Sequence, residues 1–333
     1  MKIFISIASY QDPMLEITIK SAYENASFPE NLIFGVCDQS EHPINLDLLS
    51  FSDNIHYDHV DPVLSKGTCW ARERVQKFFN NEEYYLQIDS HMLFEPSWDK
   101  YMISYIEKIK NEGSNNHNPP IISCYPRGFE IINFEEKKFS LNSSDKSTYA
   151  LAFRENAIFL NGSYCGQKAT MTDVEIVHGY LIAAGCLFST KEFVQQVPYD
   201  KSFYFYGEEQ SISLRAFTRG FGIYHIPATP IYHLYNDAPT NVDRKLHWDK
   251  DEDSKRGVKW HERDKLSIDR LTDLINDDIE GVYGLGNKRT LKEYEYLSGV
   301  NLKDKIVSNE KKAYTSDFIS SLQWRDEIFK KIG

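Results

Sequence analysis

The sequence predicts an α/β protein: a Rossmann-like, doubly wound mixed sheet followed by a helical C-terminal extension. Short apolar runs rich in aromatic and β-branched residues alternate with helical stretches of roughly ten to fifteen residues. The hydrophobic share of 41% can fill a sizeable core, and 333 residues suffice for one large domain with an appendage. We expect one compact domain over residues 1–247, with a charged loop and helical extension packed on it over residues 248–333.

The N-terminal part of the chain reads in the order β-α-β-β-α-β. Apolar runs predict strands at residues 2–10, 31–39, 54–62 and from residue 84 onward. Helical spacing of apolar residues predicts helices at residues 11–26 and 67–83, and Pro13 stands where a helix can start. This alternation is typical of a doubly wound sheet.

The remainder of the chain continues the alternation with one less regular stretch. Residues 97–113 form a strongly amphipathic helical pattern, and residues 119–128 return to a strand. Residues 134–161 are more polar and are expected to hold a hairpin or a loop. A strand, a small-residue turn and a helix are expected within residues 175–199, and a helix ending near Gly220 precedes another strand. The tail after residue 248 is charged and then mostly helical.

Composition excludes several classes of protein. The formal net charge of −11 argues against a nucleic-acid partner, whose phosphates would be repelled. The five cysteines are scattered and unpaired in sequence, which fits a reduced compartment better than a disulfide framework or a zinc cluster. No apolar run is long enough to span a membrane, and the N-terminus lacks signal-peptide features. We therefore expect a cytoplasmic protein.

The stretch "YYLQIDSHMLFEPSWD" places an acid and an imidazole at the end of a buried strand. Asp89 and His91 are two residues apart, so both side chains project to the same face. They lie at the carboxyl end of the strand, where open α/β sheets bind ligands. Together they can hold a divalent cation such as Mn²⁺ and leave positions for phosphate oxygens. The alternative is that Asp89 caps a turn and His91 bonds a backbone carbonyl.

Several motifs, read together, resemble one enzyme family. "IDSH" resembles the metal-binding element of the retaining polypeptide N-acetylgalactosaminyltransferases. The fuller set resembles the related GlcNAc-transferases that modify hydroxyproline on a cytoplasmic ubiquitin-ligase adaptor. Its other members, in family order, are "IFISIASYQDPMLEITIKSAYENA", "FGVCDQ", "GTCWARE", "AAGCLFS", "FYGEEQSISLRAF" and "RTLKEYEYLSGV". The resemblance implies a GT-A fold with its catalytic domain over residues 1–247, a UDP-GlcNAc donor, Mn²⁺ or Mg²⁺, and retention of anomeric configuration.

The resemblance also implies a third metal ligand, a histidine on a later segment. His233 in "PIYHLYN" is the favoured candidate beside Asp89 and His91. His225 in "GIYHIP" is the competing candidate, but it lies within an apolar strand, which is typical of a core histidine with satisfied hydrogen bonds.

Donor binding is assigned by the same resemblance. The residues expected to contact the UDP-sugar are Ala8, Ser9, Tyr10, Asp38, Arg72, Asp89, Ser90 and Gly185. Small residues and a ring at the end of the first strand allow close approach of the uracil. Asp38 would accept a hydrogen bond from the uracil or the ribose, and Arg72 would contact the nucleotide. Otherwise Asp38 is a turn residue and Arg72 a charge on a helix surface.

Glu208 and Glu209 precede an apolar helical pattern and are the expected catalytic residues. Acids are favoured at a helix N-terminus in any case, because the helix dipole stabilises them there. The resemblance adds that this pair faces the sugar and the acceptor.

The functional prediction is a metal-dependent retaining glycosyltransferase that moves GlcNAc from UDP-GlcNAc to a hydroxyl of a polypeptide or a glycan. A catalytically inactive UDP-sugar-binding module and a metal-dependent hydrolase are the alternatives. Acceptor contacts are expected within residues 133–167 and 249–257, because binding loops are the variable part of a fold. The sequence leaves the acceptor and the oligomeric state open.

Overall fold

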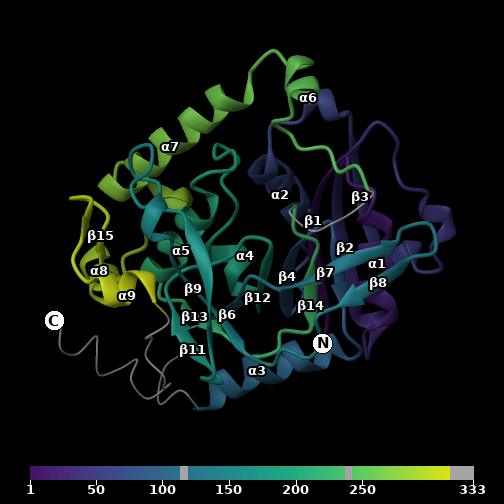
Figure 1. The fold of residues 1–333 in the computed structure, drawn as a ribbon, viewed down its shortest axis with the longest axis horizontal. Coiled ribbons are helices and arrows are strands. Elements are labelled where there is room, and N and C mark those ends of the chain that lie inside the picture. Colours follow the sequence, from purple (N-terminus) through teal and green to yellow (C-terminus); the bar gives the residue numbers. More distant parts are fainter. Residues whose placement is uncertain (113–118, 237–241, 316–333) are drawn as a thin grey trace.

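A large mixed sheet runs through the centre of the structure, a computed structural model that describes residues 1–112, 119–236 and 242–315 (Figure 1). Its strands are β1 (Ile3–Tyr10), β2 (Leu32–Gln39), β3 (Ile55–Val60), β4 (Tyr84–Asp89), β6 (Pro120–Ser123), β11 (Val177–Gly179), β12 (Cys186–Thr190) and β13 (Gly222–His225). Their order across the sheet is β11-β13-β6-β12-β4-β1-β2-β3. The four N-terminal strands are parallel to one another, and β12 lies antiparallel between β4 and β6. The predicted doubly wound mixed sheet is therefore confirmed.

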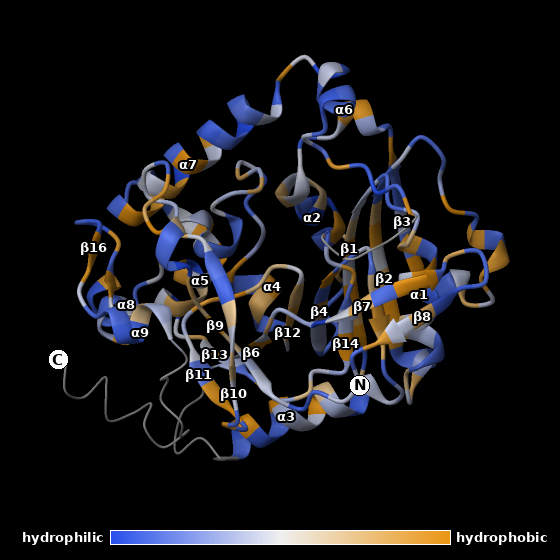
Figure 2. Ribbon diagram, viewed as in Figure 1, coloured by the Kyte–Doolittle hydropathy of each residue, from blue (hydrophilic) through white to orange (hydrophobic). Residues whose placement is uncertain are grey.

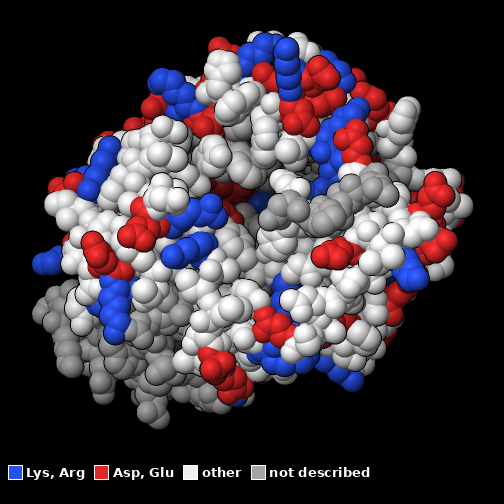
Figure 3. All heavy atoms as spheres, in the orientation of Figure 1, with Lys and Arg blue, Asp and Glu red and all other residues white. Residues whose placement is uncertain are grey.

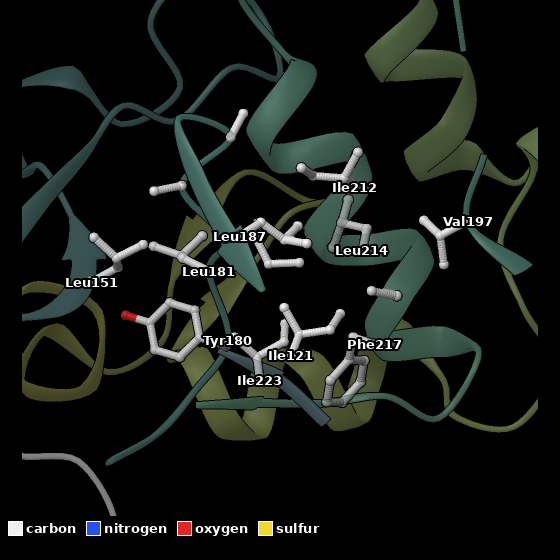
Figure 4. Packing of buried hydrophobic residues seen from close by; sticks show 14 of the residues in the cluster. Ile121, Leu151, Tyr180, Leu181, Leu187, Val197, Ile212, Leu214, Phe217 and Ile223 are labelled. Atoms are coloured by element: carbon white, nitrogen blue, oxygen red, sulfur yellow. The ribbon is translucent and has the colours of Figure 1, made fainter. Parts of the chain in front are cut away.

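Helices cover both faces of this sheet. They are α1 (Leu15–Glu24), α2 (Thr68–Gln76), α3 (Trp98–Glu112), α4 (Glu192–Gln196) and α5 (Glu208–Thr218). Alternate residues of β1 point to opposite faces: Ile3 and Ile5 join the apolar cluster that contains α1 and α3, whereas Phe4 joins the cluster of α2 and α5. Figure 4 shows the second cluster, in which Ile212 and Leu214 of α5 face the strands.

One element differs from the sequence prediction. Residues 175–199 contain two strands, β11 and β12, rather than one strand and a turn before α4. All five residues of β12 are buried, because this strand sits between two others in the middle of the sheet. A short apolar run of this kind cannot be separated from the beginning of a buried helix by periodicity alone.

A smaller sheet packs beside the carboxyl end of β4. It contains β5 (Met92–Phe94), β14 (Ile231–His233), β7 (Arg127–Asn133) and β8 (Lys138–Leu141), in the order β5-β14-β7-β8. A separate hairpin joins β9 (Thr148–Phe153) to β10 (Gln167–Thr172). The stretch predicted as a hairpin or a loop thus contributes strands to two small sheets.

The C-terminal part is mostly helical as far as the structure describes it. Its elements are α6 (Lys250–Ser254), α7 (Trp260–Asn276), α8 (Leu291–Ser298), β15 (Val300–Asn301), β16 (Ile306–Val307) and α9 (Glu310–Tyr314). Short 3₁₀ helices lie at Pro29–Asn31, Leu46–Leu48, Ser52–Asn54, Pro62–Leu64, Glu155–Ala157 and Gly281–Tyr283. Figure 2 shows mostly hydrophilic residues along α6 and α7, in contrast to the apolar strands of the sheet.

The helix expected at the end of the chain falls on residues 316–333, which lie outside the described residues. Among the helices that the structure describes, none combines the length and apolarity needed to cross a membrane.

Candidate active site

A cavity of about 670 Å³ opens at the carboxyl ends of β1 and β4. Its wall includes Tyr10 and Asp89 from these strands, and a hollow with charged side chains is visible near the middle of the face in Figure 3. Most of the residues predicted for donor, metal or catalytic roles line it: Ala8, Tyr10, Arg72, Asp89, Ser90, His91, Gly185, Glu208, Glu209 and His233. Segments far apart in sequence therefore meet at the edge of the sheet where α/β proteins bind ligands.

Asp89, His91 and His233 form one compact group in this cavity. Each offers a ligand atom, and these atoms all lie within 4.8 Å of one another. The Nε2 atoms of His91 and His233 are 3.0 Å apart, and His233 Nε2 is 3.3 Å from Asp89 Oδ2. One carboxylate oxygen and two imidazole nitrogens suit a first-row divalent cation.

Strand pairing explains how residue 233 reaches residues 89 and 91. The antiparallel pairing of β14 with β5 places His233 opposite Met92. The amide of Leu234 donates a hydrogen bond to the carbonyl oxygen of His91 at 3.1 Å. Because β5 follows β4 after only two residues, the smaller sheet carries the third side chain to the end of the larger one.

The protonation states of this group favour cation binding. Burial alone would raise the pKa of Asp89, but hydrogen bonding to His233 and the charge of Arg72 hold it well below the ordinary value. Burial lowers the pKa of His233, although Asp89 opposes that shift. At neutral pH the group therefore offers an ionised carboxylate and a neutral imidazole, which are the forms that bind metals.

The competing histidine, His225, lies elsewhere. Its ring is fully buried in β13, with Nδ1 2.6 Å from the carbonyl oxygen of Ser123. The amide of Leu151 donates to Nε2 at 3.4 Å, so both ring nitrogens have partners. Burial lowers the pKa of His225 to about 4. The structure places this histidine in the core and brings His233 to the cavity.

Arg72 bridges two of the predicted acids. Its side chain is 2% exposed, donates to Asp89 Oδ1 at 2.8 Å and also forms an ion pair with Glu208. Burial disfavours the charged guanidinium, but the two carboxylates raise the pKa of Arg72 well above its ordinary value. Arg72 is not the helix-surface charge of the alternative interpretation.

Glu209 also lines the cavity, but its carboxyl group has a different environment. Its Oε1 accepts a hydrogen bond from the amide of Ala184 at 2.9 Å, and its Oε2 accepts one from the hydroxyl of Tyr125 at 3.1 Å. Burial raises the pKa of Glu209 to about 7, with the nearby charge of Glu208 adding to the effect. The carboxyl group is therefore held in place and changes protonation state near neutral pH.

The predicted nucleotide residues divide into two groups. Ala8, Ser9 and Tyr10 line a small side pocket of about 40 Å³, and the buried hydroxyl of Ser9 has no hydrogen-bond partner among the described residues. Asp38 is not among the described residues that line either of these two pockets. Its carboxylate instead accepts a hydrogen bond from Tyr57 at 2.5 Å, because the neighbouring strand β3 brings that tyrosine alongside it.

Sequence reasoning missed several residues of the site. Asp12 contacts His91 at 2.6 Å and Ser90 at 2.8 Å. The hydroxyl of Tyr10 donates to Glu252 at 2.7 Å and accepts a hydrogen bond from Arg256. The only available signal for Asp12 was its place directly after the first strand. Glu252 and Arg256 fall in the charged stretch predicted to contact an acceptor, but here they hold the ring expected beside the uracil.

Gly185 leaves room for the Asp89 carboxylate, so enlarging it should disturb the cation site. A methyl group at this position would lie 2.4 Å from Asp89 Oδ2. We expect Gly185→Ala to weaken Mn²⁺ binding on the order of tenfold, as outer-shell changes at metal sites typically do, in isothermal calorimetry. Gly257→Ala is the matched control, since a methyl group there meets nothing within 4 Å. Equal Mn²⁺ affinity of both variants would contradict this assignment of the glycine.

The raised pKa of Glu209 predicts a pH dependence of stability. A carboxyl group with a pKa of about 7 in the folded state and 4.5 ordinarily stabilises the fold below about pH 4.5, and that contribution is lost as pH rises through 7. Relative to Glu209→Gln, the free energy of unfolding should fall by up to about 3 kcal/mol from pH 4.5 to 8. Denaturant unfolding at several pH values measures this. The same substitution at the exposed Glu130 should leave the pH profile unchanged.

Comparison with known proteins places the chain in a family. A family model described as "Glycosyltransferase (GlcNAc)" matches residues 42–304. Comparison with curated proteins gives no significant match. A crystal structure of GalNAc-T7 with UDP, GalNAc and Mn²⁺ superposes with a TM-score of 0.50 at 12% identity, covering 71% of this chain and 44% of that chain. This chain thus spans less than half the length of that protein.

Two bacterial and archaeal structures are also similar. S. aureus TarS 1-349 in complex with UDP-GlcNAc gives a TM-score of 0.41 at 12% identity, covering 83% of this chain and 73% of that chain. The mannosyltransferase PcManGT from Pyrobaculum calidifontis, in complex with GDP-Man and Mn²⁺, gives 0.41 at 9% identity, covering 67% and 53%. The superposition on GalNAc-T7 supports the predicted GT-A fold. The match over residues 42–304 shows that the chain belongs to the GlcNAc glycosyltransferase family.

Proposed function

We propose that the protein transfers GlcNAc from UDP-GlcNAc to a hydroxyl of a polypeptide or glycan acceptor, with retention of configuration and dependence on Mn²⁺ or Mg²⁺. The observation that carries the proposal is the convergence of Asp89, His91 and His233 in a cavity that Arg72 and Glu209 also line. The solved relative GalNAc-T7 was crystallised with UDP, GalNAc and Mn²⁺, which is the chemistry expected of such a cavity.

The three proposed metal ligands fit a divalent cation. Asp89 Oδ1 is engaged by Arg72, whereas Oδ2 faces His233 and is available. The Nε2 atoms of His91 and His233 lie 3.0 Å apart, so a cation that both ligate would replace the hydrogen bond between them. A bound cation would supply positive charge that stabilises the departing diphosphate. Asp89, His91 and His233 would hold it, and the chain's other side chains position the donor and the acceptor.

In a mechanism that retains the anomeric configuration, Glu208 and Glu209 have different roles. Attack from the face that UDP leaves lets an oxygen of the leaving phosphate take the acceptor proton, so no side-chain base is needed for that step. Glu209, fixed by Ala184 and Tyr125, is free to orient a sugar or acceptor hydroxyl and to stabilise positive charge at the sugar. Glu208 is 3% exposed and paired with Arg72, so we assign it to positioning that arginine.

Composition and burial support a cytoplasmic setting. All five cysteines are buried and free, which fits the cytoplasm. The charge of −11 fits a protein or glycan acceptor better than a nucleic acid. We also infer that residues 1–247 form the catalytic domain and that residues 248–333 form an extension, whose described part, residues 248–315, packs on it. The hydrogen bond from Tyr10 to Glu252 supports this arrangement, since it joins the two parts.

Removing a proposed metal ligand should abolish transfer. Release of UDP from UDP-GlcNAc, measured with and without Mn²⁺, should fall by on the order of 100-fold or more in Asp89→Ala, His91→Ala and His233→Ala. Thermal unfolding without metal tests whether these variants remain folded. The exposed His261 on α7 is the matched control, and its alanine variant should retain Mn²⁺-dependent activity.

Near-normal turnover by Asp89→Ala would refute the donor-site assignment. Absence of any turnover in the native protein, with UDP-GlcNAc still bound, would instead indicate an inactive binding module. Rapid release of free GlcNAc, at a rate that does not fall when an acceptor is added, would indicate a hydrolase.

Stereochemistry tests the retaining mechanism without knowledge of the acceptor. When water replaces the acceptor, the first sugar released from the α-configured donor should be α-GlcNAc. The anomeric coupling constant in ¹H NMR spectra recorded before mutarotation gives this directly. Glu209→Gln should slow release substantially while donor binding persists, and the anomer should remain α. An initial β-anomer would indicate inversion and would make one of the two glutamates the general base.

A further inference from the structure

The carboxylate of Asp12 makes contacts that no sequence motif anticipated. Asp12 lies between β1 and α1, and its side chain is 6% exposed. Its Oδ2 accepts a hydrogen bond from the hydroxyl of Ser90 at 2.8 Å and lies 2.6 Å from Nδ1 of His91. Its Oδ1 accepts a hydrogen bond from the amide of Met14 at 2.9 Å. Three contacts therefore fix this carboxylate on the side of the His91 ring opposite His233.

We propose that Asp12 is a positioning residue that fixes the tautomer and orientation of His91, so that its Nε2 lone pair points to the cation site. This inference rests on the proposed metal-dependent function. An ionised carboxylate only accepts hydrogen bonds, so the 2.6 Å contact requires the proton of His91 to be on Nδ1. The other ring nitrogen, Nε2, then carries a lone pair directed at the cation site, where it accepts a hydrogen bond from His233 Nε2 at 3.0 Å when no cation is bound. Carboxylate partners of this kind orient metal-bound histidines and raise their basicity.

The hydroxyl of Thr18 holds the backbone on both sides of His91 in place. The hydroxyl of Thr18 on α1 donates to the carbonyl oxygen of Ser90 at 2.7 Å and accepts from the amide of Met92 at 2.8 Å. The helix that follows Asp12 thus holds both sides of His91. His233 has no comparable support, because its Nδ1 is buried without a hydrogen-bond partner among the described residues. Among the described residues, His91 therefore has a carboxylate partner at the ring nitrogen that faces away from the cation site, whereas His233 meets a carboxylate only at Nε2, through Asp89.

Asp12→Asn is the sharpest test, because Asn cannot make all three contacts. The amide of Met14 is a fixed donor, so the Asn oxygen is best placed toward it and the Asn NH₂ toward His91. His91 would then accept at Nδ1 and carry its proton on Nε2, which blocks the cation site. In the native protein without metal at pH 8, ¹⁵N NMR of the histidine rings should show the Nδ1–H form of His91. In Asp12→Asn it should show the Nε2–H form.

The second readout is Mn²⁺ affinity measured by calorimetry. Loss of an outer-shell partner should weaken binding about 10- to 100-fold in Asp12→Asn, and Asp12→Glu, which restores an acceptor-only group, should recover part of it. The matched control is Asp99→Asn. Asp99 is also a buried carboxylate, and it accepts hydrogen bonds from the amides of Ser27 and Phe28. It is not among the described residues that line the cavity. Its variant should lose stability without losing Mn²⁺ affinity.

Two outcomes would overturn the inference. One is an Nε2–H tautomer of His91 in the native protein, and this measurement stands even if Asp12→Asn does not fold. The other is an Mn²⁺ affinity of Asp12→Asn within twofold of the native value. Failure of the native protein to bind Mn²⁺ would count against the proposed function instead, and the tautomer of its His91 would still decide the role of Asp12.

Discussion

The site depends on how the carboxylate of Asp89 is divided between two neighbours. One oxygen accepts a hydrogen bond from Arg72, and the other faces His233. Gly185 approaches this carboxylate so closely that a methyl group there would lie 2.4 Å from Oδ2. Because β4 lies between β1 and β12 in the middle of the sheet, this carboxylate is held by strand pairing on both sides. Its two oxygens thereby connect the proposed metal ligand His233 with Arg72 and, through Arg72, with Glu208.

The ion pairs of Arg72 offset part of the free-energy cost of burying the charges of Asp89 and Glu208. A buried carboxylate or guanidinium without a partner would cost several kcal/mol of stability, and the cost is offset only when the partners are well placed. Arg72 has two acidic partners, Asp89 and Glu208, and its hydrogen bond with Tyr199 at 3.3 Å adds a third contact. Among these three side chains the two carboxylates exceed the arginine by one negative charge, and Oδ2 of Asp89 faces His233. A group with this excess of negative charge suits a divalent cation.

The sequence allowed prediction of the parts of this site that follow from local spacing. Asp89 and His91 were singled out because residues two apart in a strand share a face, but β4 ends at Asp89 and His91 lies in the two-residue link to β5. Arg72 and His233 came from motifs that resemble a known family. Asp12 is 79 residues from His91, and Tyr10 is 242 residues from Glu252, so no local pattern could pair them. For Asp38, local spacing gave the right place near the end of a strand but not the partner of the side chain. Its carboxylate accepts a hydrogen bond from Tyr57 of the next strand.

Two carboxyl groups that line the cavity have pKa values shifted in opposite directions. Burial would raise the pKa of both Asp89 and Glu209, yet the cationic and hydrogen-bonding neighbours of Asp89 reverse that effect, whereas Glu209 keeps a pKa of about 7. Groups whose environments separate their pKa values in this way commonly take different roles in one reaction. On the proposed function, Asp89 must remain ionised to hold a cation. Glu209 gains from populating both forms, because it can then accept a hydrogen bond from a sugar hydroxyl or donate one. The division follows from placing one acid beside Arg72 and the other beside the amide of Ala184 and the hydroxyl of Tyr125.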